Sequence, residues 1–473
     1  MSAPLREAYE LAVVGAGPAG LAAATRAAAL GVDTVLLDEQ ASPGGQIHRA
    51  IVETPVRDHA VLGADYWRGA ALVDAFRGSG AAYVPGASVW SVTRGVELGL
   101  SIDGAAHVTQ ARRVILATGA LERPMPIPGW TLPGVMTVGA AQILLKTGGL
   151  VAERPIVLAG SGPLLWLFAR QHLAAGGRIA ALLDTTPRDN RGRALPHLPG
   201  FLRSPYAVKG LRLIAAVRAR VRVIGGITAL RAEGDTQLRA LSYRRGDGAE
   251  QRLATELLLL HQGVVPQLNL ALAARVAPVW DDAQRCFHPA VDTWGATAVD
   301  GVAVAGDGAG IAGAEAAVWH GRIAALDAAY RLGRIDRAQR DRAAGPERAM
   351  LERWTRGRRF LDALYRPADA LVVPADGTVV CRCEEVTARQ VRDAVALGAA
   401  GPNQLKAFLR CGMGPCQGRL CGLTVSELIA ATRGVSPAAV GHYRLRPPVK
   451  PITLGELASL PKSGGAVGAV VRG

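Results

Sequence analysis

Five of the six cysteines lie in one short part of the sequence. Cys381 and Cys383 form a C-x-C pair, and Cys411, Cys416 and Cys421 follow in a glycine-rich stretch. Four thiolates can hold either a Zn²⁺ ion or a [2Fe–2S] cluster. Paired cysteines of structural zinc sites are usually separated by two to four residues, so the C-x-C pair favours the iron–sulfur cluster. Any two of the three later cysteines would complete the set, and spacing alone leaves that choice open.

A second chemical signature lies near the N-terminus, between a predicted strand at 11–14 and a predicted helix that ends near residue 30. The residues of this turn and of the start of the helix are Gly15, Gly17, Pro18, Ala19 and Gly20. The three glycines permit a sharp turn, a close approach of the backbone to a pyrophosphate, and close packing of the helix on the strand. The phosphates are expected at the positive, N-terminal end of the helix.

An acidic residue stands where such a fold binds the adenosine ribose. Asp38 follows the second predicted strand, at 34–37, eighteen residues after Gly20. Its carboxylate can accept hydrogen bonds from the ribose hydroxyls, and Glu39 is the alternative if the register shifts by one. The pattern predicts an adenine dinucleotide site, with an ordinary glycine-rich turn as the competing interpretation.

The strand–turn–helix pattern recurs about 145 residues downstream. Gly160 and Gly162 keep two of the three glycines, and Leu165 stands at the third place. A branched side chain there pushes the helix away from the strand and narrows the space for phosphates. Asp184, after the next predicted strand, can still bind a ribose. The pattern favours a retained fold with weak or lost nicotinamide binding over a working NAD(P)H site; a different nucleotide as a static ligand is a third interpretation.

The elements that position these motifs predict an α/β chain with two dinucleotide-binding domains and a small cysteine-containing domain. A hairpin is expected at 239–259, a buried strand at 302–305, and an apolar helix at about 313–332. The expected division gives 1–150 and 265–332 to the first dinucleotide-binding domain, 151–264 to the second, 333–374 to a charged helical connector, 375–440 to the cysteine domain, and 441–473 to an extended arm.

Composition limits the classes of function. The 473-residue chain is 49% hydrophobic and carries a formal charge of +15. Its Arg residues are scattered, with no basic run interleaved with aromatics, so nucleic-acid binding is not expected. We find no secretory signal pattern and no run of about 18 apolar residues, and therefore expect no membrane span. Clustered thiols suit a reducing compartment, and the cytoplasm is the expected location.

The cysteine region resembles the [2Fe–2S] domain of the bacterioferritin-associated ferredoxin type. In that family the second cysteine pair follows the C-x-C pair by about thirty residues, and 32 residues separate Cys383 from Cys416 here. The resemblance therefore implies a cluster held by Cys381, Cys383, Cys416 and Cys421, with Cys411 as the spare thiol. The small domain is expected to be rich in helix.

The first dinucleotide fold resembles that of two-dinucleotide-domain, glutathione-reductase-like flavoproteins, which implies FAD as its ligand. The segments that carry the resemblance are Gly45–Gln46, Ala117–Thr118–Gly119 and Gly306–Asp307. In that superfamily the first segment lies near the flavin, the second crosses between the domains, and the acid of the third contacts the ribityl chain or the pyrophosphate. Capping of a helix N-terminus is the simpler role for Asp307, and both roles are compatible.

Over nearly its whole length, the sequence resembles the alpha (A-type) subunits of multi-subunit FAD-dependent amine and imino-acid dehydrogenases. These include opine oxidase, D-hydroxyproline dehydrogenase, hydrogen cyanide synthase and dye-linked L-proline dehydrogenase. The most specific segments are 132–137, 381–422 and 446–451. The resemblance implies a partner subunit, similar to D-amino-acid oxidase, that carries its own FAD and oxidises the substrate. Some such systems add a small ferredoxin-like [2Fe–2S] subunit, and FMN can sit at a subunit boundary.

The expected function is that of an electron-transfer subunit containing FAD and a [2Fe–2S] cluster. The substrate class implied by the resemblance comprises D-hydroxyproline, proline, opines and glycine, and the sequence identifies no catalytic residue. One alternative is a free-standing NAD(P)H-dependent flavin oxidoreductase that reduces its own cluster. The other is a scaffold with a degenerate nucleotide fold and a zinc module.

Overall fold

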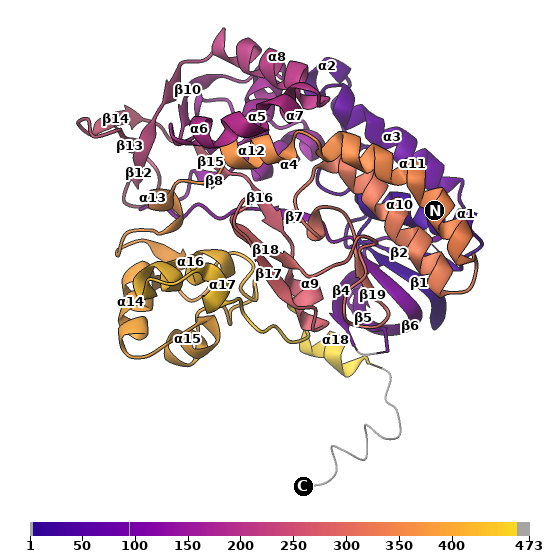
Figure 1. Cartoon of the computed structure of the whole chain (residues 1–473). Helices are drawn as coiled ribbons and strands as arrows, with labels where there is room; N and C mark the ends of the chain where they lie inside the picture. The colour runs from indigo at the N-terminus through magenta and orange to yellow at the C-terminus, as the bar shows by residue number, and fades with distance from the viewer. Residues whose placement is uncertain (1–2, 94, 461–473) are drawn as a thin grey trace.

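The computed structural model describes residues 3–93 and 95–460. The first dinucleotide fold is built on a seven-stranded sheet (Figure 1). Its order is β3-β2-β1-β6-β5-β4, and β19 pairs with the second half of β6. Strands β3, β2, β1, β6 and β19 are parallel, whereas β5 pairs antiparallel with the first half of β6 and β4 pairs antiparallel with β5. The strands are β1 (Ala8–Val14), β2 (Thr34–Leu37), β3 (Ala82–Val84), β4 (Ser88–Val92), β5 (Glu97–Ile102), β6 (Ala105–Leu116) and β19 (Val302–Val304).

Alanine-rich helices cover one face of this sheet. Helix α1 (Pro18–Ala29) begins with a proline, whose missing N–H costs nothing at the first helical position. It packs tightly on α10 (Ala314–Arg331): a Cβ at Gly321 would lie 2.1 Å from the carbonyl oxygen of Ala19. Helix α3 (Ala64–Arg77) packs on α1 and on α2 (His59–Leu62), and the charged α11 (Arg337–Thr355) packs on α10. The small side chains of α1 and α10 thus allow the two helices to approach closely beside the glycine turn that precedes α1.

The second dinucleotide fold is built on a five-stranded parallel sheet, in the order β11-β10-β9-β15-β8. Its strands are β8 (Val135–Thr137), β9 (Ile156–Ser161), β10 (Ile179–Asp184), β11 (Val223–Gly225) and β15 (Leu258–Gln262). Its helices are α4 (Val138–Gly148), α5 (Pro163–Ala174), α6 (Asn190–Ala194), α7 (Leu198–Leu202) and α8 (Tyr206–Arg218), with a 3₁₀ turn at Leu195–His197. The repeat expected from the sequence is confirmed.

An antiparallel sheet of three strands lies against this fold: β12 (Ile227–Glu233), β13 (Ala240–Arg245) and β14 (Gln251–Ala254). The expected hairpin is present, but its second strand ends at Ala254, because the apolar run that follows enters the parallel sheet as β15. Two short strands, β7 (Ala120–Glu122) and β16 (Val264–Pro266), pair antiparallel where the chain crosses between the two folds.

A small helical module follows the connector helices α12 (Arg358–Leu364) and α13 (Asp369–Val372). It contains β20 (Val379–Cys381), β21 (Val386–Thr387), α14 (Ala388–Ala396), α15 (Pro402–Leu409), α16 (Gly422–Arg433) and α17 (Pro437–Val440). In Figure 1 it lies beside β17 (Pro278–Asp281) and β18 (Cys286–Pro289), near α9 (Asn269–Ala273). The module is thus docked on the second part of the first dinucleotide fold.

The arm returns to the first sheet after the helical module. Val449 is buried, its N–H donates to the carbonyl of Trp90 at 3.0 Å, and α18 (Leu454–Ala458) follows. The remaining part of the predicted arm, 461–473, lies outside the described residues. Of the helices that the structure describes, none combines the length and the apolar character that a membrane crossing requires.

One apolar core runs from the first sheet into the helical module. It joins Val14 and Leu116 of the sheet through Leu268 and Leu270 to Val425 of α16. The thiols of Cys381, Cys411 and Cys421 belong to the same core. The cysteine module therefore shares its interior with the dinucleotide fold.

Candidate cofactor sites

The first glycine turn is crowded on both sides. Gly15 has φ +106°, a conformation that favours glycine, and a Cβ there would lie 2.5 Å from the carbonyl oxygen of Ala117. A Cβ at Gly20 would lie only 1.8 Å from the carbonyl oxygen of Gly15. In the described chain, no side chain caps the start of α1 at Gly17. The start of the helix is therefore available to an anion.

Asp38 supports this turn from β2. The residue is buried, and its carboxylate accepts hydrogen bonds from the N–H of Ala16 at 3.0 Å and of Gln40 at 3.1 Å. Burial raises the pKa of Asp38, and the two N–H donors oppose that rise. Glu39 points elsewhere and forms an ion pair with Lys450 of the arm. Asp38 is thus better placed than Glu39 to face a ribose at the turn.

The Gly45–Gln46 segment packs directly on the glycine turn. A Cβ at Gly45 would lie 2.7 Å from the Cα of Gly17. A buried cation holds this segment from α4: Lys146 Nζ donates to the carbonyl oxygens of Gln46 and Ile47, both at 3.0 Å. Burial, together with the nearby charge of Arg49, lowers the pKa of Lys146 to about 7.

Lys146 is the first member of a buried polar chain between the two folds. Its ammonium also donates to Gln142 Oε1 at 2.9 Å. The Gln142 amide donates to Gln171 Oε1 at 2.7 Å, and Gln171 donates to the carbonyl of Leu62 at 2.8 Å. The three carbonyl oxygens bonded to Lys146 match the three N–H donors of its ammonium. Because Lys146 lies in α4 of the second fold, that fold holds the Gly45–Gln46 segment in place.

The other two predicted segments meet at the same place. Gly306 approaches α1 so closely that a Cβ there would lie 2.6 Å from the Cβ of Ala19. A Cβ at Gly308 would lie 3.4 Å from the backbone N and O of Gly119, and the Thr118 hydroxyl donates to the carbonyl of Gln267 at 3.3 Å. The turn, the crossing segment and the Gly306–Asp307 segment are therefore brought together.

The N-cap of α10 is Gly313, where no side chain of the described residues forms a cap, so the helix-capping role considered for Asp307 is wrong; Asp307 instead fixes the backbone just before the helix. Its Oδ1 accepts hydrogen bonds from the N–H groups of Ala312 and Gly313, both at 2.8 Å, immediately before α10. The other carboxylate oxygen makes neither of these bonds. A role toward the ribityl chain or the pyrophosphate is compatible with this geometry.

Two features beside these segments are consistent with a bound flavin dinucleotide: open space, and a buried polar atom without a partner in the described chain. A Cβ at Gly119 or Gly310 would meet nothing within 4 Å. Gln267 donates its N–H to the carbonyl of Gly119 at 2.9 Å, while its side-chain Oε1 is buried without a hydrogen-bond partner in the described chain. A buried acceptor without a donor is costly, and a ligand donor would satisfy it.

The cysteines form two adjoining groups. The Sγ atoms of Cys381, Cys411 and Cys421 all lie within 4.8 Å of one another, and these residues are buried. Cys383 and Cys416 are more exposed and lie beside each other. Hydrogen bonds from Cys411 and Cys421 lower the pKa of Cys381 to about 2, which favours its thiolate. The donor set is one that binds iron or zinc.

The glycines of this loop make room for a tyrosine. A Cβ at Gly412 would lie 2.4 Å from Cζ of the buried Tyr443, and a Cβ at Gly418 would lie 2.7 Å from its Cδ2. Burial and the adjacent thiols raise the pKa of Tyr443 well above its usual value. The ring closes one side of the thiol group and keeps it from solvent.

The second glycine turn contains a histidine that no local motif indicates. His261 is buried on β15, its Nδ1 lies 2.5 Å from Glu122 Oε1, and its Nε2 lies 3.3 Å from where a Cβ of Gly162 would be. Leu165 is fully buried and packs beside Val138 and Leu158. The third glycine position has thus become part of the core.

A cavity of about 700 Å³ lies at the end of β10 in the second fold. Asp184 lines it, with Oδ1 held by the N–H and the hydroxyl of Thr186 at 3.0 and 2.6 Å. The arginines that line it are Arg188, Arg191, Arg218 and Arg245. Within the described residues, none of these four forms an ion pair with a carboxylate. The cavity is therefore rich in positive charge.

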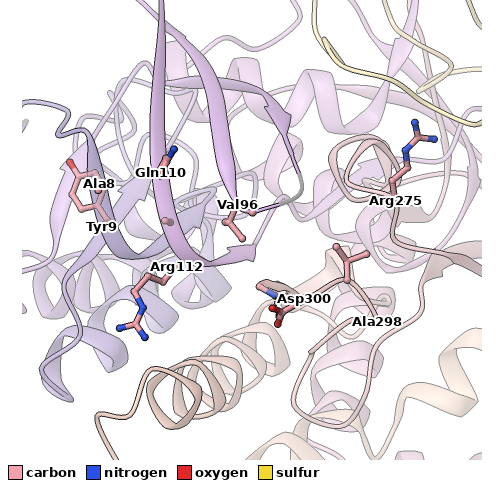
Figure 2. A pocket seen from close by; sticks show the side chains of 12 residues that line it. Ala8, Tyr9, Val96, Gln110, Arg112, Arg275, Ala298 and Asp300 are labelled. Atoms are coloured by element: carbon pink, nitrogen blue, oxygen red, sulfur yellow. Dashed lines mark hydrogen bonds between the residues drawn. The ribbon is translucent and has the colours of Figure 1, made fainter. Parts of the chain in front are cut away.

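A second cavity, of about 750 Å³, lies at the other end of the first sheet (Figure 2). Tyr9 at the start of β1 lines it together with Arg112, Arg275 and Asp300. The glycine turn follows the opposite end of β1. This cavity is therefore separate from the predicted dinucleotide site.

Two family models match the chain. The model described as pyridine nucleotide-disulphide oxidoreductase matches residues 9–321, and the model described as BFD-like [2Fe-2S] binding domain matches residues 379–431. The first covers both dinucleotide folds, and the second covers the thiol module.

Similar proteins span nearly the whole chain. The A-type subunit of opine oxidase from Rhizobium meliloti is 48% identical, covering 98% of this chain and 90% of its own length. The HcnB subunit of hydrogen cyanide synthase from Pseudomonas protegens is 31% identical over 93% of this chain and 95% of its own. The L-proline dehydrogenase structure from P. horikoshii shares the fold, with a TM-score of 0.68, 16% identity, and coverage of 95% and 79%. The chain is therefore a flavoprotein oxidoreductase with a [2Fe–2S] module, and it belongs to the family of the A-type subunits of opine oxidase.

Proposed function

We propose that this chain is the electron-transfer subunit of a multi-subunit dehydrogenase that oxidises an amino or imino acid. The supporting observation is the shared core, which places the thiol module directly against the dinucleotide fold. The relatives are named as subunits of opine oxidase and of hydrogen cyanide synthase. The proposed substrate class comprises opines, proline, D-hydroxyproline and glycine.

The proposed FAD site uses the residues that meet around the first turn. Gly15, Gly17, Pro18, Ala19 and Gly20 would hold the pyrophosphate, Asp38 the ribose, and Gly45, Gln46, Ala117, Thr118, Gly119, Gly306 and Asp307 the flavin half. When bound, FAD supplies two-electron hydride chemistry and the cluster supplies one-electron transfer. The contribution of the chain is to orient the cofactor and to exclude water.

The proposed cluster ligands are Cys381, Cys383, Cys416 and Cys421. Cys411 is the alternative, because its thiol lies within the compact group with Cys381 and Cys421. The more exposed side, at Cys383 and Cys416, gives electrons a route to the surface. We propose 375–440 as the cluster domain, and we move the boundary between the two dinucleotide folds to before β8 (Val135–Thr137), because β8 pairs with β15 of the second sheet.

The second dinucleotide fold is proposed to bind a nucleotide as a static ligand. The arginine-lined cavity beside Asp184 supports this, because unpaired guanidinium groups attract phosphate.

The proposed assembly contains two further subunits: a D-amino-acid-oxidase-like partner that carries FAD, and a small ferredoxin-like partner that carries a [2Fe–2S] cluster. It also contains FMN at a subunit boundary. The clustered thiols suit a reducing cytoplasm.

The test is the cofactor content of the purified full-length chain. We expect flavin absorbance with a [2Fe–2S] shoulder, and about two irons and two sulfides per chain. A colourless protein that holds only zinc would contradict the proposal. Rapid bleaching of the flavin by NADH or NADPH would instead favour a free-standing NAD(P)H-dependent reductase. Mass spectrometry of a complex purified under mild conditions identifies the partner subunits.

A further inference from the structure

A buried carboxylate lies at the contact between the thiol module and the dinucleotide fold. Glu427 projects from α16, the helix that begins directly after Cys421. Only 2% of the residue is exposed. Among the described residues of the module, 379–431, no other acidic residue is buried. A charge in this position requires partners close by.

Two arginines of the dinucleotide fold face this carboxylate. Arg285 Nε donates to Glu427 Oε2 at 3.0 Å, and Arg123 Nη1 lies 3.9 Å from Glu427 Oε1. Arg285 also pairs with Asp369 in the connector. The group therefore joins three parts of the chain that are far apart in sequence.

Arg123 is itself held rigidly where the chain crosses between the two folds. It directly follows β7, and its guanidinium donates to the carbonyl oxygens of Gln284 at 2.7 Å and Arg285 at 2.9 Å. Its preceding neighbour, Glu122, contacts His261 below the second glycine turn. Through Arg123, helix α16 is therefore in contact with the segment that connects the two dinucleotide folds.

Two further polar contacts join the module to the dinucleotide folds. Asn269 donates to the carbonyl of Gln417 at 3.0 Å, and Trp130 Nε1 donates to the carbonyl of Val379 at 2.7 Å. Each is a bond from a neutral donor to a carbonyl oxygen. The charged group differs, because a small displacement of α16 would leave several buried charges without partners.

We propose that Glu427 is a positioning residue: through Arg123 and Arg285 it fixes the thiol module at one distance and orientation relative to the flavin site. This inference rests on the proposed function, because it concerns electron transfer between the two bound cofactors. Glu427 does not contact the thiols in this scheme. Its effect is exerted through the placement of α16 and hence of Cys421.

The test is the Glu427→Gln variant of the full-length chain, purified with its cofactors. The amide keeps the size of the side chain and removes its charge. We expect unchanged flavin, iron and sulfide contents and an unchanged cluster EPR spectrum, but cluster reduction by the reduced flavin about tenfold slower or more. Hydrogen exchange of the α16 amides should increase. The matched control is Glu385→Gln, which removes an exposed charge two residues after Cys383 and should leave the rate unchanged.

A second variant covers the case in which Glu427→Gln does not accumulate. Arg123→Lys keeps the charge but cannot reach both carbonyl oxygens and the carboxylate together, so it should slow the same step. Wild-type rates in either loaded variant would overturn the inference, as would a variant that folds but contains no cluster. If the wild-type chain itself contains no flavin or no cluster, the proposed function fails instead.

Discussion

Lys450, in the C-terminal arm, forms an ion pair with Glu39, the residue that follows the buried acid of the first dinucleotide fold. Although burial opposes it, Lys450 lowers the pKa of Glu39 and keeps the carboxylate charged. The arm is held nearby by the bond from Val449 to Trp90. A segment more than 400 positions away in sequence therefore lies against the end of β2, where the adenosine is proposed to bind.

Replacement of Lys450 should weaken cofactor retention modestly. A partly exposed ion pair contributes about 0.5–1 kcal/mol, so Lys450→Met should raise the Kd for FAD about two- to fivefold. Fluorescence titration of the apoprotein measures this, and the effect should shrink at high salt. Arg154→Met, which removes an exposed ion pair with Glu256 in the second fold, is the control. Equal affinities at low salt would show that the arm does not support this site.

Replacement of Lys146 should have a larger effect. Lys146→Met removes the donor shared by the carbonyl oxygens of Gln46, Ile47 and Gln142, and buried acceptors without donors cost about 1–3 kcal/mol. We expect at least tenfold weaker FAD binding and a lower Tm, measured by flavin fluorescence and calorimetry. Lys209→Met, which removes an exposed ion pair with Asp65, serves as the control. Retained flavin with a lower Tm would limit Lys146 to a structural role.

Serine substitutions separate the cluster ligands from the spare thiol. Iron should fall from about two atoms per chain to nearly none in Cys381→Ser, Cys383→Ser, Cys416→Ser and Cys421→Ser. Cys411→Ser should keep its iron, as should Cys286→Ser, which lies outside the module on β18. Iron and sulfide assays with EPR measure this. Loss of iron in Cys411→Ser together with retention in Cys416→Ser would replace one proposed ligand by the other.

Acid should destabilise the protein through two buried histidines. Burial lowers the pKa of His48 and of His442 to about 4. Because the folded pKa lies below the usual value of 6.5, the contribution to stability is complete above pH 6.5 and is lost as the pH falls towards 4. Each histidine accounts for a loss on the order of 3 kcal/mol across that window. Denaturant unfolding at several pH values measures it.

The matched variants for this pH dependence are His48→Gln and His59→Gln. His48 lies under the Gly44 turn and is bonded to the carbonyl of Tyr66 at 2.9 Å, whereas His59 is exposed. The pH dependence should become shallower only in His48→Gln. An unchanged slope in that variant would assign the acid sensitivity to other groups.

Local patterns were sufficient to predict the first strand–turn–helix unit, its repeat and the helical connector. Gly15, Gly20 and Asp38 lie close together in sequence, and the turn requires glycines and an acidic residue at these positions. No local pattern indicated Lys146, two of whose three acceptors lie about 100 residues earlier. The same holds for the contact of Glu122 with His261, 139 positions away, and for Arg285 with Glu427, 142 positions away. Such partners are set by tertiary packing, which a motif does not encode.

The continuous interior shared by the first sheet and the thiol module has a consequence for biogenesis. A domain with its own interior can mature separately and be joined to its neighbour later. Here Cys381, Cys411 and Cys421 share one apolar core with Leu268, Leu270 and the first sheet, so their surroundings are complete only when the two parts have packed together. Iron delivery in the cell would therefore be a late event that follows translation of the whole chain, and iron starvation should leave an otherwise assembled protein with a loosened C-terminal end.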